Sequence, residues 1–515
     1  MASSVKPPPN EFGAAEAVRS TWERVLGCPV EWGDDFFDLG GDSLTALSVA
    51  ADIAQATGLV VPAGWLYRHP RIADAVRALL RSPAADISAP IPLPRQGRHP
   101  LSSQQDGLLA VMRHIGGEHR YQVAYAVALD ARMDAGRLRA AWQRMPDRHP
   151  ALATRLVPCG DTFVQDVHAA LSPPLEHVVV SSGASVGKVT DRWACADIAL
   201  DGPLARAGLI QGAGEIRFVL AAHQMVMDPW SWGLLLRDLA VLYADPDAGG
   251  APRLAYSDYA RWQHTHLTGQ NYARHLRFWQ EAADGSPAGG ARLPGAPGVI
   301  APAGPAARLP LQVPGELVAV LDERSRSLGA SLFEALLALF QLAVGRWAGT
   351  DDVLVASATA SRTVPTEDVA GFFVNGRFTR TRIIAGTAAD LVDQVKHSWR
   401  AAEEHRELHL EKTLFDLGRP DMANVKFSLN TIPGLTHLPD LGGRRMRAVP
   451  VTGAASARRH VSVGLTRVED GLAGALTYRT DLLTQDTVAD LMADLDQLLR
   501  AFAADPDQPL SLARR

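Results

Sequence analysis

The sequence predicts a small four-helix bundle followed by a larger α/β domain of two lobes, and three observations support this fold class. Apolar side chains recur at helical spacing in residues 14–26, in the stretch that opens at Asp42-Ser43, and in residues 63–67 and 71–81. Beyond residue 100, apolar strands alternate with amphipathic helices. Two stretches rich in proline and glycine interrupt the chain.

These two breaks set the expected domain boundaries. The expected parts are a helical domain at 11–82, a Pro-rich linker at 83–100, a first lobe at 101–283, a Gly/Pro/Ala-rich crossover at 284–310 and a second lobe at 311–510. Prolines in the linker forbid helix, so it is expected to be extended and to span up to about 50 Å. The crossover has too few large apolar side chains to pack, which predicts a loop.

Hydrophobic periodicity predicts individual elements of the larger domain. Apolar runs predict strands at residues 122–129, 217–222 and 353–357, and helical spacing predicts helices at 135–145, 230–243 and 331–347. Pro229 is suited to the first position of its helix, whose apolar stripe comprises Trp232, Leu235, Leu236, Leu239 and Leu242.

Length, charge and cysteine usage limit the classes of function. At 515 residues the chain is too long for one core and suits about three compact units. A net charge of -5 gives no electrostatic reason to expect nucleic acid or an anionic membrane as partner. The three cysteines, Cys28, Cys159 and Cys195, support neither a disulfide framework nor a zinc site. Without a signal peptide or a membrane-spanning apolar run, we expect a soluble, cytoplasmic protein.

The most informative motif is the string FFDLGGDSL at residues 36–44. Ser43 opens an apolar-periodic helix, where backbone N–H groups and the helix dipole favour a phosphodiester on its hydroxyl. Gly40 and Gly41 allow a close turn before it. An ordinary N-cap role for Asp42 or Ser43 is the alternative. The string resembles the LGGDSL core of peptidyl carrier proteins, which implies 4'-phosphopantetheine carried covalently on Ser43 and a phosphopantetheinyl transferase as partner.

The second motif is HQMVMDP at residues 223–229. It resembles the HHxxxDG signature of nonribosomal peptide synthetase condensation domains, with glutamine in place of the second histidine and proline in place of glycine. Five further strings follow the family order: LSSQQ at 101–105, RHPALATR at 148–155, YSDYARW at 256–262, GFFVN at 371–375 and HRELHLEK at 405–412. The resemblance implies two chloramphenicol-acetyltransferase-like lobes in a V, with a tunnel that the donor and acceptor carriers enter from opposite faces.

The resemblance also implies roles for the residues of this motif. His223 is the structural histidine, Gln224 holds the catalytic place, and Asp228 is a scaffold aspartate for which Arg362 is a candidate partner. A glutamine amide cannot titrate near neutral pH and so cannot be a general base, but it can donate and accept hydrogen bonds. Positioning alone could support aminolysis of a thioester, at a cost of roughly 100- to 10,000-fold in rate. Pro229 removes one backbone donor from the centre.

Other polar residues also have simpler interpretations. His223 and Asp228 lack a third ligand, so we expect no metal. Ser231 matches the serine after the signature and is predicted as a first-turn helix residue beside the substrate channel rather than a nucleophile. Asn375 and Arg377 are further candidates for the substrate channel; Arg377 is either solvated or places a charge in the acceptor channel. The motif histidines at 405 and 409 are expected at the surface or an interface.

Three functions remain open from the sequence. In the first, the carrier holds an aminoacyl or peptidyl thioester and the condensation domain transfers it to an acceptor amine. The second is a catalytically silent module, similar to the X domain of glycopeptide synthetases, that recruits tailoring enzymes. The third is a diverted reaction such as cyclisation, ester formation or release. Nothing resembles the ATP-binding motifs of an adenylation domain, so the expected partners include an adenylation domain or upstream synthetase in trans and an acceptor carrier protein.

Overall fold

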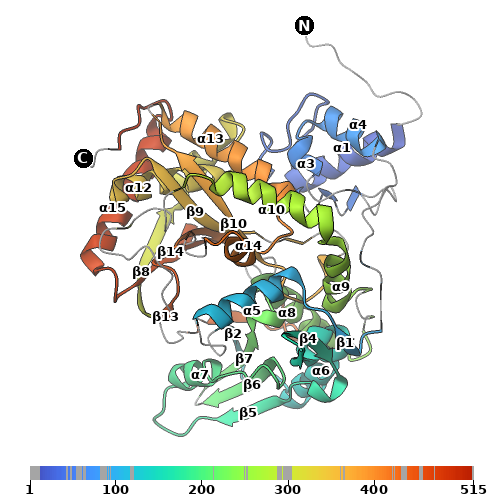
Figure 1. The fold of residues 1–515 in the computed structure, drawn as a ribbon. Helices are drawn as coiled ribbons and strands as arrows, with labels where there is room; N and C mark the ends of the chain where they lie inside the picture. Colours follow the sequence, from blue (N-terminus) through green and yellow to red (C-terminus); the bar gives the residue numbers. More distant parts are fainter. Residues whose placement is uncertain are drawn as a thin grey trace.

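The structure is a computed structural model of the 515-residue chain. It describes residues 12–41, 45–46, 49–50, 52–53, 61, 65–81, 90, 92, 94–115, 121–212, 214–248, 250, 253–286, 293, 304–359, 361–362, 366–384, 386–419, 422, 424–430, 438–449, 451, 456–468 and 470–512. A small helical domain lies beside two α/β lobes (Figure 1).

The helical domain packs around aromatic side chains. Trp22 meets Phe36 edge to face, with ring centroids 5.0 Å apart, and Phe36 meets Phe37 in the same manner at 5.3 Å. Its described helices are α1 (Phe12–Leu26), α3 (Trp65–Arg68) and α4 (Ile72–Arg81). These overlap three of the four predicted segments. The fourth opens at Asp42 and Ser43, which lie outside the described residues.

The N-lobe is built on a five-stranded sheet in the order β12-β2-β7-β6-β5. The strands are β2 (Gln122–Leu129), β5 (Leu175–Val179), β6 (Ala205–Gly212), β7 (Glu215–His223) and β12 (Arg447–Val449). Its helices are α5 (Ser103–Ile115), α6 (Ala135–Arg148), α7 (Val186–Ala194), α8 (Pro229–Ala244) and α9 (Tyr256–His266). The next helix, α10 (Gly269–Ala283), packs in the C-lobe, where Trp279 joins Leu354 and Phe378 in one buried cluster. A small sheet joins β1 (Gly97–His99), β4 (Thr162–Val167) and β3 (Thr154–Cys159). Because β12 comes from the C-terminal part of the chain and pairs with β2, the two lobes interlock.

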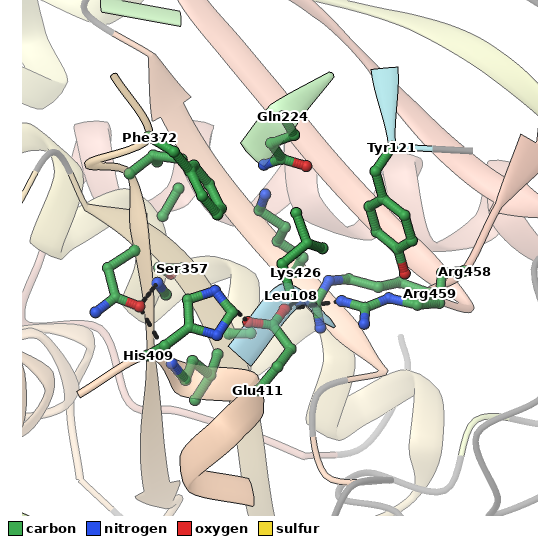
Figure 2. Close-up of a pocket in the computed structure, with 16 residues that line it drawn as sticks. Leu108, Tyr121, Gln224, Ser357, Phe372, His409, Glu411, Lys426, Arg458 and Arg459 are labelled. Carbon is green, nitrogen blue, oxygen red and sulfur yellow. Dashed lines mark hydrogen bonds and ion pairs between the residues drawn. The ribbon is translucent and has the colours of Figure 1, made fainter. Parts of the chain in front are cut away.

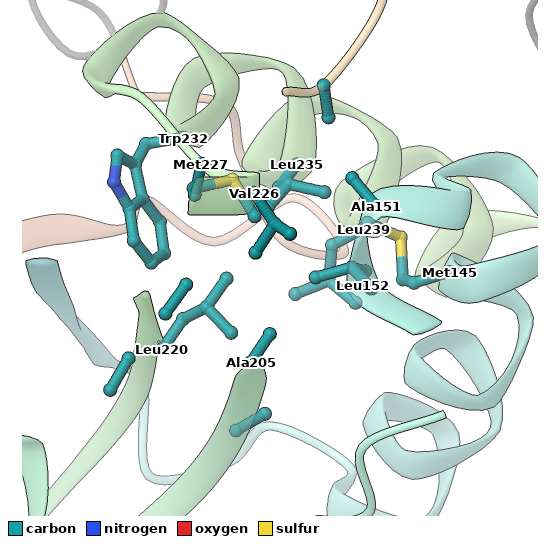
Figure 3. Close-up of a cluster of buried hydrophobic side chains, with 14 of the residues drawn as sticks. Met145, Ala151, Leu152, Ala205, Leu220, Val226, Met227, Trp232, Leu235 and Leu239 are labelled. Atoms are coloured by element: carbon teal, nitrogen blue, oxygen red, sulfur yellow. The ribbon is translucent and has the colours of Figure 1, made fainter. Parts of the chain in front are cut away.

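The apolar stripe predicted for α8 is buried in the N-lobe core. Figure 3 shows Trp232, Leu235 and Leu239 from this helix facing Leu220 of β7 and Met145 of α6. Pro229 occupies the start of α8, as predicted. This packing fixes the helix at the end of β7 and therefore the short segment between them, which carries the HQMVMD motif.

The C-lobe has a seven-stranded mixed sheet in the order β10-β9-β11-β14-β15-β8-β13. Its strands are β8 (Gly304–Pro314), β9 (Asp352–Thr359), β10 (Asn375–Arg382), β11 (Val425–Asn430), β13 (Ser456–Ala457), β14 (Val461–Val468) and β15 (Gly471–Arg479). Its helices are α11 (Gly315–Ser327), α12 (Leu332–Ala348), α13 (Ala388–Ala401), α14 (Leu410–Asp416) and α15 (Gln485–Ala504). A capping box between Ser331 and Glu334 begins α12, and Gly349 ends it with φ 65°.

The expected linker and the expected crossover each contain part or all of a β-strand. Residues 97–99 of the expected linker form β1, and residues 304–310 of the expected crossover begin β8. The composition of these stretches is poor in large apolar side chains, but a strand needs only a backbone partner. β4 supplies that partner for β1, and β15 supplies it along β8.

No single helix in the described part of the chain is long and apolar enough to cross a membrane. Helices α11 and α12 pass such a test only as a pair, bent by 100° at their junction. Helix α12 is buried along almost its whole length in the C-lobe core.

Candidate active site between the two lobes

Strand β7 delivers two adjacent motif residues to the junction of the lobes. The backbone N–H of Gln224 donates to the carbonyl oxygen of Tyr121 at 2.6 Å, which holds the segment after β7 against the start of β2. The half-buried side chain of Gln224 lines a cavity of about 160 Å³. In Figure 2 its amide points into this cavity, toward the side chain of Lys426.

His223 has a different environment from its neighbour. Its side chain is fully buried, and Nδ1 accepts a hydrogen bond from the Met225 backbone N–H at 3.1 Å. Because Nδ1 is an acceptor, the neutral ring carries its proton on Nε2. His223 is absent from the described cavity lining, whereas Gln224 faces the cavity. The structural role expected for His223 stays a prediction.

Asp228 is the centre of a buried hydrogen-bond network. Its carboxylate accepts from both terminal nitrogens of Arg362, with Nη2 to Oδ1 at 3.0 Å, so the partner expected from the sequence is in contact with it. Asp228 also accepts from the Ser231 backbone N–H at 3.0 Å and from those of Phe373 and Val374 at 3.1 Å each. The aspartate therefore joins the first turn of α8 to the C-lobe and is saturated by these contacts.

Ser231 belongs to the same network. Its Oγ lies 2.7 Å from Asp228 Oδ1 and 3.0 Å from the Gly371 carbonyl oxygen, while the Gly371 N–H donates to it at 3.0 Å. The side chain is fully buried in the first turn of α8, as predicted, but the described cavity lining does not include it. Ser231 therefore links α8 to Gly371 by hydrogen bonds. It does not line the cavity, contrary to the substrate-channel position expected from the sequence.

Asn375 lines the cavity, but its amide is occupied by backbone groups. Nδ2 donates to the carbonyl oxygens of Arg406 and Leu408 at 2.7 and 2.8 Å, and Oδ1 accepts from the Leu410 N–H at 3.1 Å. These bonds hold the segment that carries His409 and α14. Asn375 is thus suited to shaping the cavity wall.

Arg377 is neither solvated nor part of the described cavity lining. Its side chain is 1% exposed and pairs with Glu403 at 2.8 Å. The guanidinium also stacks over Trp399, 3.8 Å from the ring centroid. Arg377 is therefore neither a solvated arginine nor a charge in the described cavity, as the sequence suggested. It forms a buried ion pair inside the C-lobe.

One wall of the cavity carries charged side chains that no sequence motif predicted. Glu411 Oε1 accepts from Arg458 at 2.8 Å and from Arg459 at 2.7 Å, and Lys426 projects from β11 into the same space (Figure 2). Burial would raise the pKa of Glu411, but the neighbouring cationic groups lower it. Burial and the charge of Arg459 lower the pKa of Lys426 to about 8. The pair of adjacent arginines was the one sequence signal available, and nothing local linked it to residue 411 or 426.

His409 corrects another expectation. Of the two positions expected for it, surface or interface, the structure excludes the surface: His409 is buried where α14 packs against α5, and it lines the cavity. Burial lowers its pKa, so the ring is neutral near neutral pH. A Cβ atom added to Gly107 of α5 would lie 2.1 Å from Nδ1 of His409, so this face of the ring is covered by the helix. His405 is half-buried and stacks on Phe278, which places it among packed rings.

The helical domain contacts the C-lobe through the loop that precedes Ser43. Arg400 of α13 lies over the ring of Phe37, 4.5 Å from its centroid. The loop itself requires its glycines: Gly40 has φ 94°, and a Cβ on Gly41 would lie 2.2 Å from the Phe36 ring. Gly40 and Gly41 therefore form a tight turn just before Ser43, the residue predicted to carry the phosphopantetheine arm.

Comparisons with known proteins agree with this architecture. Residues 16–79 match the phosphopantetheine attachment site family, and residues 95–513 match the condensation domain family. The chain is 30% identical to a linear gramicidin synthase protein from Brevibacillus parabrevis, over 96% of this chain and 7% of that protein. It is 27% identical to surfactin synthase subunit 1 from Bacillus subtilis (strain 168), over 96% of this chain and 14% of that one. It thus spans a small part of these relatives.

Solved structures confirm the predicted fold class. The X-domain from teicoplanin biosynthesis superposes with a TM-score of 0.73 at 23% identity, covering 83% of this chain and all of that one (100%). The first condensation domain of the calcium-dependent antibiotic synthetase, in complex with a substrate analogue, gives 0.65 at 20% identity, covering 80% and 98%. The large domain therefore has the two chloramphenicol-acetyltransferase-like lobes of such proteins. The chain belongs to the condensation domain family of nonribosomal peptide synthetases, with a phosphopantetheine-carrying domain ahead of the condensation domain.

Proposed function

We propose that this protein transfers an aminoacyl or peptidyl group from its own carrier, attached through Ser43, to an acceptor amine, and that Gln224 positions the reacting groups. The C–N bond forms as the thioester C–S bond breaks, and the amine proton ends on the released thiol. The observation that carries the proposal is the Gln224 amide, which faces the cavity from the end of β7 while the Asp228–Arg362 scaffold remains intact.

The cavity offers a physical account of transfer without a histidine base. The Gln224 amide can donate to a thioester oxygen or accept from the amine. Three cationic side chains nearby, Lys426, Arg458 and Arg459, would lower the pKa of an acceptor ammonium and so favour the neutral nucleophile. The same charges would stabilise the oxyanion that develops at the carbonyl.

The test is single-turnover transfer followed by intact-protein mass spectrometry. A phosphopantetheinyl transferase and an adenylation domain or upstream synthetase load Ser43, and the acceptor arrives on its own carrier protein. Gln224→Ala is expected to slow transfer by about five- to 150-fold, the cost of one or two hydrogen bonds. Gln211→Ala, an exposed amide on β6, serves as the matched control, and Ser43→Ala should accept no arm.

Recruitment of a tailoring enzyme is the second candidate. Gln224 and Pro229 both depart from the condensation signature, and Pro229 takes one backbone donor from the start of α8. One similar solved structure is described as a complex of the X-domain and OxyB from teicoplanin biosynthesis. Equal transfer by wild type and Gln224→Ala, both at the uncatalysed background, would favour a recruitment module over an acyltransferase.

A further inference from the structure

The wall of the cavity opposite Gln224 carries an excess of positive charge. Among the described lining residues, Lys426, Arg458 and Arg459 are cationic and Glu411 is the one carboxylate. Glu411 contacts both arginines, and burial keeps His409 neutral near neutral pH. An excess of two positive charges therefore faces the space in front of Gln224.

Lys426 is the part of this wall that lacks a compensating contact. Its neighbours on β11, Val425 and Phe427, point into the C-lobe core, so the alternation of the strand directs Lys426 to the cavity. Within the described part of the chain, no hydrogen bond or ion pair reaches its Nζ. Burial and the two arginines lower its pKa to about 8 although the charge of Glu411 acts in the opposite direction, so Glu411 compensates the ammonium only in part. Such a group is costly unless an anion binds beside it.

We propose that Lys426, Arg458 and Arg459 form a carboxylate-binding subsite beside Gln224, and that the substrate taken at this centre carries a free carboxylate. This inference rests on the proposed transfer at Gln224. Arginine presents parallel N–H donors that match the two oxygens of a carboxylate, and the lysine adds a movable point charge. The arginine side chains are 19% and 13% exposed, so part of each remains open to the cavity while Glu411 is bound.

The hydroxyl of Tyr121 completes the polar lining of this wall (Figure 2). Burial raises the pKa of Tyr121, so the phenol stays protonated at neutral pH and can donate to an anion. The cavity of about 160 Å³ suits a short acidic group.

Two kinds of substrate could bring a carboxylate to this position. The α-carboxyl group of a carrier-bound residue forms the thioester and is uncharged, so the side chain of that residue must carry the carboxylate. A free amino acid used as acceptor has its α-carboxylate available instead. Both present the same chemical group to Lys426, and an experiment with separate probes distinguishes them.

The experiment measures binding by calorimetry to the full-length protein with its carrier in the holo form. The probes are N-acetylglutamate α-amide, which has a side-chain carboxylate only, N-acetylglutamine, which has an α-carboxylate only, and N-acetylglutamine α-amide, which has neither. We expect one of the two acids to bind at least about 10-fold more tightly than the neutral probe, as a charge-assisted contact predicts. The preferred acid identifies the source of the carboxylate.

The variants test whether Lys426 is responsible. Lys426→Met should abolish the preference for the acid, Lys426→Arg should retain it, and Lys188→Met, at an exposed lysine of α7, should leave it unchanged. Lys426→Gln replaces the methionine variant if circular dichroism shows that the latter is unfolded. Equal binding of all three probes to wild type, or an unchanged preference in folded Lys426→Met or Lys426→Gln, would overturn the subsite.

Binding and transfer fail independently of each other. An acid preference that depends on Lys426, without transfer by any variant, would uphold the subsite and refute the proposed transfer. Transfer that depends on Gln224, without any acid preference, would refute the subsite and leave the proposed function standing.

Discussion

Arg362 Nη2 donates to Asp228 Oδ1 at 3.0 Å and joins the first turn of α8 to the segment that follows β9. Both side chains are buried, at 0% and 1% exposure. The contact spans 134 positions of sequence and links the two lobes beside the cavity. The position of Gln224, four residues before Asp228, therefore depends on a buried ion pair.

Asp228→Asn is expected to destabilise the protein strongly. The substitution keeps the shape of the side chain but leaves the Arg362 guanidinium without a compensating charge, which should lower the free energy of unfolding by about 3 to 5 kcal/mol. Urea denaturation followed by circular dichroism measures the change. Asp496→Asn breaks an exposed ion pair with Arg500 on α15 and should cost at most about 1 kcal/mol. Similar losses for both variants would contradict the buried-pair interpretation.

Local patterns predicted the elements around this pair. Strand β2 has the predicted bounds of 122–129, and α8 begins at Pro229 with its apolar stripe buried, because period and capping chemistry act within a few residues. No local pattern could assign residues 447–449 to the N-lobe sheet. Strand β12 exists only because β2 offers a free edge to a segment far along the chain.

Pairing between distant strands also decides which charged side chains face the cavity, so the sequence could not predict them. Arg377 is paired in register with Ser357, which is itself paired with Phe427 of β11, so it shares the face that packs under α12 and α13. Lys426 precedes Phe427 by one residue and is paired with Ala356, so its side chain points to the opposite face of the sheet. One residue of register decides which cation enters the cavity, and the sequence does not reveal register between distant strands.

Arg377→Ala should therefore change stability rather than acceptor preference. Its loss leaves Glu403 with Arg406 at 2.6 Å as a remaining partner, so the free energy of unfolding should fall by about 2 to 4 kcal/mol. Arg382→Ala, at an arginine of the same strand that is 67% exposed, should cost less than about 1 kcal/mol. Altered use of acidic acceptors by folded Arg377→Ala, with unchanged stability, would return this residue to the acceptor channel.

Lys426→Met is expected to stabilise the ligand-free protein. The folded-state pKa of about 8 lies below the ordinary 10.5 of the unfolded chain, so between these pH values the folded state binds fewer protons and wild-type stability rises with pH. Below pH 8 the buried ammonium destabilises the folded state by a constant amount. The variant should exceed wild type by about 1 to 3 kcal/mol at pH 7, with the difference shrinking between pH 8 and 10.5.

Urea denaturation at pH 7, 8.5 and 10 measures this difference. Lys188→Met should match wild type at each pH, because its lysine is exposed. A stability difference between Lys426→Met and wild type that stays constant with pH would contradict the depressed pKa. The cost of this lysine to the empty protein is consistent with a role in binding an anion.

The contact between the carrier and the C-lobe should respond to charge reversal at Asp38. A Cβ on Gly329 would lie 2.9 Å from Asp38 Oδ1 and 3.9 Å from Lys396 Nζ, so the carboxylate and the ammonium both lie near the loop between α11 and α12. Arg400 adds a second cation nearby. Burial raises the pKa of Asp38, while these cations favour its charged form.

Asp38→Lys brings a third positive charge to this contact and should release the carrier from the C-lobe. Small-angle scattering of the apo protein should then give a larger radius of gyration, independently of whether Ser43 can be modified. Glu16→Lys is the control, since the ion pair of Glu16 with Arg19 stays within α1. Combining Asp38→Lys with Lys396→Asp should restore the compact form, because the exchanged charges attract again. Equal scattering by Asp38→Lys and Glu16→Lys would show that other contacts, such as the cation–π contact of Arg400 with Phe37, hold the two domains together without the Asp38 carboxylate.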